Sequence, residues 1–127
     1  MWGEDDLPFR LPTTAEEPPH EGGYFPPPSG VRMTLLHFLR DGDAAAAGGA
    51  LDAIMDGGGD GMHQTDSVDV GWMISGELGV ELDSGETQWL YPGDLIVQNG
   101  TRHRWINRGD EPAVAGFLTF GARRDDR

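Results

Sequence analysis

The sequence has no cysteine at any of its 127 positions. Disulfides, thiolate nucleophiles and cysteine-based zinc sites are therefore excluded, and any metal must be bound by histidine, carboxylate or hydroxyl groups. Basic residues are also scarce, because 9 Lys and Arg stand against 22 Asp and Glu, for a formal net charge of −13. Such an acidic chain repels phosphate backbones and anionic membranes, so we expect no nucleic-acid partner and no membrane partner.

Long apolar runs are missing as well. No stretch approaches the roughly 18 residues that a membrane-spanning helix needs. The N-terminus also lacks a basic segment followed by an apolar one, the pattern of a secretory signal. These features predict a cytoplasmic protein, and the length of the chain suits a single domain.

Glycine and proline are abundant, with 20 and 9 residues, and the long apolar periodicity of a helix bundle is absent. This composition favours an all-β chain with many turns. The one helix that we expect is short, since Asp43 is a suitable N-cap for the alanines that follow it, although Gly48 and Gly49 weaken the case.

Three regions differ in composition. Residues 1–30 hold seven of the nine prolines and six acidic residues against one Arg, which predicts an extended, Pro-rich acidic N-terminal arm. This arm could pack on the body, wrap a partner subunit or remain a loose tail. We assign residues 31–122 to a β-barrel and residues 123–127 to a charged C-terminal tail.

Short β-compatible segments alternate with turn signals at intervals of 8–12 residues, such as Pro92-Gly93-Asp94. This spacing is typical of a sandwich or a barrel. The segments cover residues 31–40, 68–74, 78–82, 87–90, 95–98, 103–106 and 113–120.

Alternation along the strands brings three side chains with metal-binding chemistry to one face. Successive side chains of a strand point to opposite sides, so neighbouring strands can direct His63, Asp69 and His103 toward one point inside a barrel. Two imidazoles and one carboxylate form the facial triad of non-haem Fe(II) sites, and the same set accepts Mn(II), Ni(II) or Zn(II).

The stretch 63–107 resembles the two linked motifs of the cupin superfamily. The first family motif is His-x-His, three or four residues, Glu, six residues and Gly, and the second is Pro-x-Gly, two residues, His, three residues and Asn. The corresponding residues here are His63-x-Thr65, Asp69 and Gly76, followed by Gln98-x-Gly100, His103 and Asn107. The resemblance covers residues 61–120 and implies an all-β cupin barrel, that is, a double-stranded β-helix or jelly roll.

Two departures from the family pattern concern the metal site. Thr65 stands where family members usually carry a second His ligand, and Asp69 replaces a Glu that is one methylene longer. The resemblance implies one divalent ion, Fe, Mn, Ni or Zn, held by His63, Asp69 and His103. Thr65 could hydrogen-bond a bound water or the substrate.

Two further residues are candidates for the catalytic set, beside Thr65. Gln98 could reach the pocket and orient a ligand, or make a hydrogen bond at a strand edge. Trp105 shares the parity of His103 and could form a wall of the pocket, or simply fill the barrel.

Two functions remain open. The first is a small metal-dependent enzyme of the isomerase, lyase, decarboxylase, cyclase or dioxygenase type. Its metal would act as a Lewis acid on a small molecule that bears a carbonyl, enol or carboxylate group. The second is a metal-free or non-catalytic cupin that binds a small molecule. In either case we expect a homodimer, since cupins often pair through barrel edges.

Overall fold

The computed structural model describes residues 2–8, 23–41 and 61–125, which form eight strands and confirm the all-β prediction. The strands are β1 (Trp2–Glu4), β2 (Val31–Phe38), β3 (Ser67–Ser75), β4 (Leu78–Leu82), β5 (Thr87–Leu90), β6 (Leu95–Asn99), β7 (His103–Ile106) and β8 (Ala113–Gly121). The predicted short helix lies outside the described residues. Among those described, no helix is long and apolar enough to cross a membrane.

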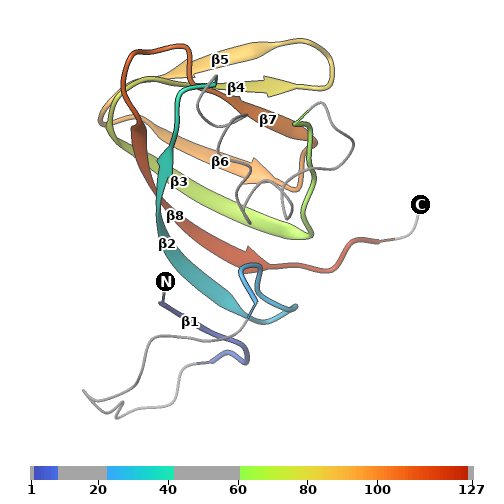
Figure 1. Cartoon of the computed structure of the whole chain (residues 1–127). Helices are drawn as coiled ribbons and strands as arrows, with labels where there is room; N and C mark the ends of the chain where they lie inside the picture. The colour runs from blue at the N-terminus through green and yellow to red at the C-terminus, as the bar shows by residue number, and fades with distance from the viewer. Residues whose placement is uncertain (1, 9–22, 42–60, 126–127) are drawn as a thin grey trace.

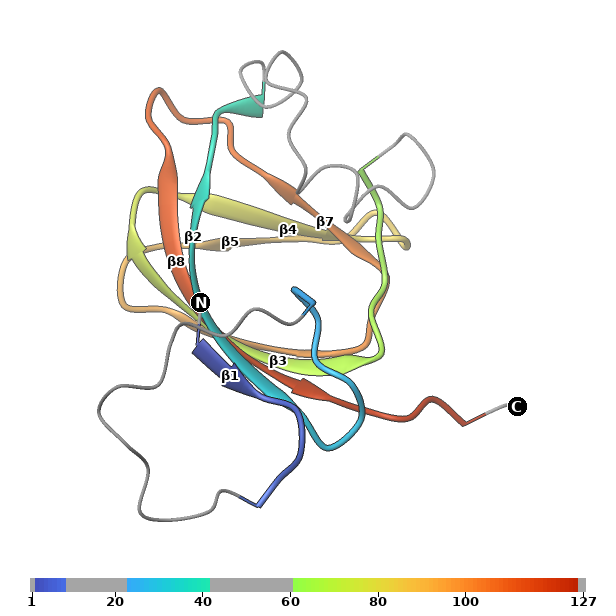
Figure 2. The ribbon, with the colours of Figure 1, turned by 60° about the horizontal axis from the view of Figure 1, so that its bottom comes forward.

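The strands form two antiparallel sheets that face each other (Figure 1). One sheet has the order β1-β2-β8-β3-β6, and the other has the order β5-β4-β7. Figure 2 shows the two sheets from a second direction. After β3 the chain forms β4 and β5 in the three-stranded sheet, and β6, β7 and β8 then alternate between the two sheets. Residues distant in sequence therefore line the same interior.

The barrel interior has an apolar end and a polar end. Alternating residues of β3 and β8 face inward, as the period of two along a strand requires. At one end they contribute to the apolar cluster, whose buried members are Met73, Leu78, Leu90, Ala113, Ala115 and Phe117. At the other end the inward positions of the same two strands are polar, with Ser67, Asp69 and Thr119.

The predicted strand segments agree with the observed strands to within two residues at each end. The short strand β1 was not predicted, because it lies in the segment assigned to the arm. Trp2, Gly3 and Glu4 pair with β2 and form the edge of the five-stranded sheet.

Arg32 attaches the N-terminal residues to the barrel. Its side chain is only 1% exposed, and its guanidinium donates hydrogen bonds to the carbonyl oxygens of Gly23 at 3.0 Å, Val31 at 3.0 Å and Glu4 at 3.3 Å. It also forms an ion pair with Asp5 at 2.5 Å. A buried charge is tolerated only when it is hydrogen-bonded in this way, so these contacts hold two N-terminal segments against β2.

Replacement of this cation tests its structural role. We expect Arg32→Met to lower the free energy of unfolding by about 2–4 kcal/mol, because several charge-assisted hydrogen bonds are lost at a buried position. Urea denaturation measures the loss. Arg123→Met is the control, because Arg123 is exposed, and we expect it to change stability by less than about 0.5 kcal/mol. Equal stabilities for the two variants would contradict the assigned role.

Candidate functional site

A row of inward-facing residues crosses four strands at the polar end of the barrel. In the sheet register Arg32 lies opposite Thr119, Thr119 opposite Asp69, and Asp69 opposite Gln98. Thr119 and Gln98 are only 8% and 5% exposed. Polar groups buried at this density require partners, or a ligand that supplies them.

His63 and His103 lie side by side above this row. Their backbones form an isolated antiparallel bridge, in which each N–H donates to the other residue's carbonyl at 2.8 and 2.9 Å. The two ring centroids are 4.4 Å apart, with the ring planes at 63°. The two residues are only 7% and 4% exposed, so the imidazoles belong to the interior.

The backbone fixes the tautomer of both rings. His63 Nδ1 lies 3.0 Å from the carbonyl oxygen of Gly61, and His103 Nδ1 lies 2.7 Å from that of Thr101. A carbonyl oxygen can only accept, so each Nδ1 must carry the proton and donate it. Each Nε2 therefore keeps a lone pair that can bind a metal ion or accept a proton.

Burial keeps both rings neutral. Desolvation and, to a smaller extent, the neighbouring His63 lower the pKa of His103 to about 4, against the opposing effect of its hydrogen bond to Thr101. Desolvation also lowers the pKa of His63, while the Gly61 carbonyl and Asp69 raise it and Arg102 lowers it. Neutral imidazole is the form that coordinates metals.

Asp69 is held by hydroxyl groups. Its Oδ1 accepts a hydrogen bond from Ser67 Oγ at 2.9 Å, and Ser67 Oγ lies 2.7 Å from Thr65 Oγ1. Burial raises the pKa of Asp69, whereas the hydrogen bonds from Ser67 and Thr119 and the proximity of His63 lower it. Thr65, for which we predicted a hydrogen bond to water or substrate, thus contacts Ser67 and helps to orient Asp69 through it.

The other two predicted site residues also face the interior. Gln98 Oε1 accepts a hydrogen bond from the hydroxyl of Thr101, the residue whose carbonyl fixes His103. The Trp105 ring centroid lies 5.3 Å from that of His103, 5.5 Å from that of Phe38 and 5.6 Å from that of Phe117. Trp105 therefore stands between the histidine pair and the apolar cluster.

Tyr24 joins the site from the N-terminal segment, which sequence reasoning did not predict. Its hydroxyl hydrogen-bonds the side chain of Thr34, an inward residue of β2 that is 9% exposed. Burial raises the pKa of Tyr24, and the nearby charge of Asp69 raises it further, so the phenol stays protonated. The sequence offered only an aromatic residue in a Pro-rich segment, which predicts packing rather than a site.

The chemical types of His63, His103 and Asp69 suit a divalent metal ion. Two neutral imidazoles with free Nε2 atoms and one carboxylate match the preferences of first-row transition metals. The hydrogen bonds at both Nδ1 atoms are the outer contacts that usually orient metal-binding histidines. In residues 2–8, 23–41 and 61–125, however, no three His, Asp or Glu side chains converge closely enough to enclose an ion by themselves.

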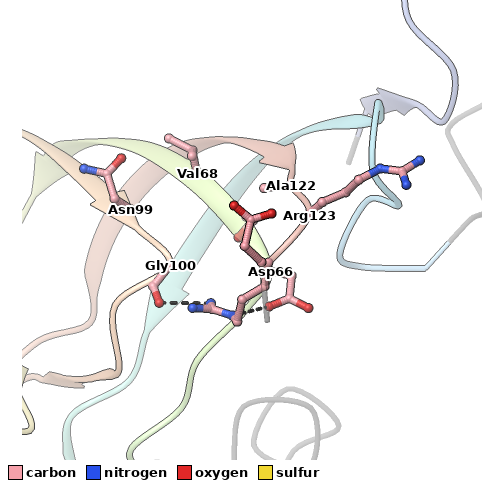
Figure 3. A pocket seen from close by; sticks show the side chains of 9 residues that line it. Asp66, Val68, Asn99, Gly100, Ala122 and Arg123 are labelled. Atoms are coloured by element: carbon pink, nitrogen blue, oxygen red, sulfur yellow. Dashed lines mark hydrogen bonds and ion pairs between the residues drawn. The ribbon is translucent and has the colours of Figure 1, made fainter. Parts of the chain in front are cut away.

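A surface pocket of about 490 Å³ lies outside the barrel, between the start of β3 and the end of β6 (Figure 3). Arg124 crosses it, with Nε 2.7 Å from Asp66 Oδ1 and Nη2 3.1 Å from the carbonyl oxygens of both Thr65 and Gly100. Arg124 thus connects the two loops that precede Asp69 and His103 through hydrogen bonds, so we assign it a structural role.

Fold and interior together define a small β-barrel protein with a buried histidine pair. The family model described as "Cupin domain" matches residues 51–120, and the chain belongs to this family. A crystal structure, that of protein NMB1881 from Neisseria meningitidis, has a TM-score of 0.51 at 13% identity, covering 87% of this chain and 90% of that one. At this identity the similarity shows the fold alone.

Curated relatives come from fungi. The chain is 47% identical over 64 residues to "Phomopsin biosynthesis cluster protein C'" of Diaporthe leptostromiformis, covering 48% of this chain and 34% of that protein. It is 39% identical over 59 residues to a cupin-domain-containing oxidoreductase of Aspergillus ruber, covering 46% of this chain and 29% of that one. The matched part thus spans about a third of these relatives' length.

The low pKa of His103 predicts a pH dependence of stability. The unfolded chain binds a proton at this residue below about pH 6.5, whereas the folded chain does so only near pH 4. Between these values the unfolded state holds more protons, so stability falls as the pH falls. We expect His103 to contribute about 3 kcal/mol to this decrease.

Chemical denaturation with a chelator present measures the effect. The quantity to follow is the unfolding free energy of the wild type minus that of His103→Gln, and it should fall from pH 7 to pH 4. The subtraction removes the contribution of Asp69, which has the opposite sign because its raised pKa favours folding at lower pH. His37→Gln serves as the control, because it removes an exposed imidazole. A pH-independent difference for His103→Gln would show that His103 is not held neutral.

Proposed function

We propose that this domain is part of a metal-dependent cupin enzyme that acts on a small organic molecule bearing a carbonyl, enol or carboxylate group. The observation that carries the proposal is the histidine pair, with both rings neutral, both Nδ1 atoms bonded to backbone carbonyls, and both Nε2 atoms left as ligands. Burial of two Nε2 acceptor atoms without a ligand would lower the stability of the fold with no functional gain.

His63 and His103 would hold the ion, and Asp69 would supply the carboxylate. When bound, a divalent ion of Fe, Mn, Ni or Zn acts as a Lewis acid on an oxygen of the substrate. The relatives named as oxidoreductases, in Aspergillus ruber, Neurospora crassa and Hypocrea virens, favour the oxidative class among the reaction types open to a cupin.

The other residues of the interior would bind and orient the substrate. Thr65 and Ser67 hold Asp69 in place, and Trp105 supplies an apolar wall beside His103. The protonated hydroxyl of Tyr24 and the amide of Gln98 can donate hydrogen bonds to substrate oxygens. A substrate with one apolar face and one or two oxygen atoms would match this distribution.

A second candidate is a metal-free cupin. It is favoured by the arrangement of the described residues, in which no three His, Asp or Glu side chains converge on one point. In that case the Nε2 atoms of His63 and His103 would accept hydrogen bonds or protons from the ligand directly, with no ion between them.

Elemental analysis of freshly purified protein separates the two candidates. We expect close to one divalent ion per chain in the wild type, and almost none in the His63→Gln/His103→Gln double variant. Asp69→Asn should weaken metal binding by about 10–100-fold, since it removes the charged ligand. Calorimetric titration of the chelated protein with each ion gives the affinities.

His37→Gln is the matched control and should retain the metal, because His37 is exposed on β2. A wild type that carries no metal and binds none of the four added ions would contradict the metalloenzyme proposal and leave the metal-free candidate. Retention of a full ion by the double variant would contradict the ligand assignment.

A further inference from the structure

Gln98 carries a buried hydrogen-bond donor without a partner among the described residues. Its side chain is 5% exposed and lies on the inward face of β6. The Oε1 atom accepts a hydrogen bond from the hydroxyl of Thr101. Within residues 2–8, 23–41 and 61–125, the Nε2 atom donates to no other group. An amide nitrogen buried in this way lowers the stability of a fold unless a ligand or an ordered water accepts its N–H groups.

Thr101 orients both this amide and the neighbouring imidazole. Its hydroxyl occupies Oε1 of Gln98, so the NH2 group of that side chain is turned away from Thr101. Its carbonyl oxygen accepts the proton of His103 Nδ1, so Nε2 of that ring keeps its lone pair. One residue thus leaves a free donor on Gln98 and a free acceptor on His103.

The other buried carboxamide in the described part of the chain uses all of its groups. Asn107 is 3% exposed, and its Nδ2 donates to the carbonyl oxygens of Phe38 and Glu111, each at 2.9 Å. Its Oδ1 accepts a hydrogen bond from the backbone N–H of Gly109 at 3.0 Å. Asn107 therefore has a structural role, whereas half of the hydrogen-bonding capacity of Gln98 has no structural use.

The surroundings of Gln98 favour a neutral acceptor. Asp69 lies opposite Gln98 in the register of β3 and β6, and side chains opposed in this way have Cβ atoms about 4.5–5.5 Å apart. A carboxylate bound at Nε2 would therefore meet the like charge of Asp69, whereas a carbonyl oxygen accepts the hydrogen bond without a charge. Trp105, whose ring centroid is 5.3 Å from that of His103, supplies apolar surface in the same interior.

We infer that Gln98 selects the ligand of this barrel by donating from Nε2 to a neutral carbonyl oxygen, that of a ketone, aldehyde, ester or amide. The inference narrows the proposed function and rests on it, since it assumes that the interior binds a small organic molecule. Two other groups are rejected at this position. A carboxylate is repelled by Asp69, and an ammonium group would direct its own N–H bonds at those of Gln98.

Thermal unfolding of the chelated, ligand-free protein tests whether the donor is unused. Gln98→Met removes the amide at nearly constant volume, and the exposed hydroxyl of Thr101 can then turn to solvent. We expect the melting temperature to stay within about 3 °C of the wild type or to rise, because no partner of Nε2 is lost.

Asn107→Leu is the matched control at the other buried carboxamide. It should lower the melting temperature by at least about 5 °C, because two carbonyl oxygens and one N–H lose their partner. A comparable fall for Gln98→Met would show that its amide is a structural group and would overturn the inference.

Titration of the chelated protein with acetophenone and with benzoate tests the recognition itself. The two probes share a phenyl ring and differ in the group beside it, a neutral ketone or a carboxylate. Acetophenone should shift the side-chain amide signals of Gln98 in ¹H–¹⁵N spectra and bind at least about tenfold more tightly than benzoate. Gln98→Met should weaken acetophenone binding by about tenfold, the effect of one hydrogen bond.

His37→Gln should bind acetophenone like the wild type, because His37 is exposed on β2. Acetophenone that does not bind, binds no better than benzoate, or binds Gln98→Met as well as the wild type would overturn the inference and leave water as the partner of Nε2. Because the titration contains no metal ion, its result is independent of the ligand assignment of His63, Asp69 and His103, which elemental analysis tests separately.

Discussion

The backbone bridge between His63 and His103 is the contact on which the candidate site depends. It joins the segment that leads into β3, in the five-stranded sheet, to the first residue of β7, in the three-stranded sheet. The same two hydrogen bonds that connect these segments therefore also bring the imidazoles within 4.4 Å of each other. The carbonyls of Gly61 and Thr101, each two residues earlier in the chain, then set the ring tautomers.

The division of the barrel interior into two ends gives this pair its chemistry. The apolar cluster fills one end, and Trp105 separates it from the histidines. At the other end, hydroxyl groups of Ser67 and Thr119 hold Asp69, and Arg32 attaches the segment that carries Tyr24. Neutral bases, a hydrogen-bonded carboxylate and a protonated phenol thus share a partly buried interior, where electrostatic interactions are stronger than in solvent.

Much of the fold followed from local pattern. Turn residues and alternation predicted seven strands, and the parity argument placed His63, Asp69 and His103 on inward positions. The register between strands could not be read from one sequence, because it depends on which strands become neighbours. The row that joins Asp69 to Gln98 and Thr119 was therefore not foreseen. Nor was Tyr24, whose segment is held against β2 in part by the hydrogen bond from Arg32 to Gly23.

The tautomers of the two rings provide the most direct test of this account. Long-range ¹H–¹⁵N correlation spectra of labelled, metal-free protein at neutral pH distinguish the protonated ring nitrogen from the bare one. For both His63 and His103 we expect a proton on Nδ1 and a bare Nε2, as the carbonyl contacts require. A proton on Nε2 of either ring, or a doubly protonated imidazole, would contradict the assignment of these residues as a pair of ligands.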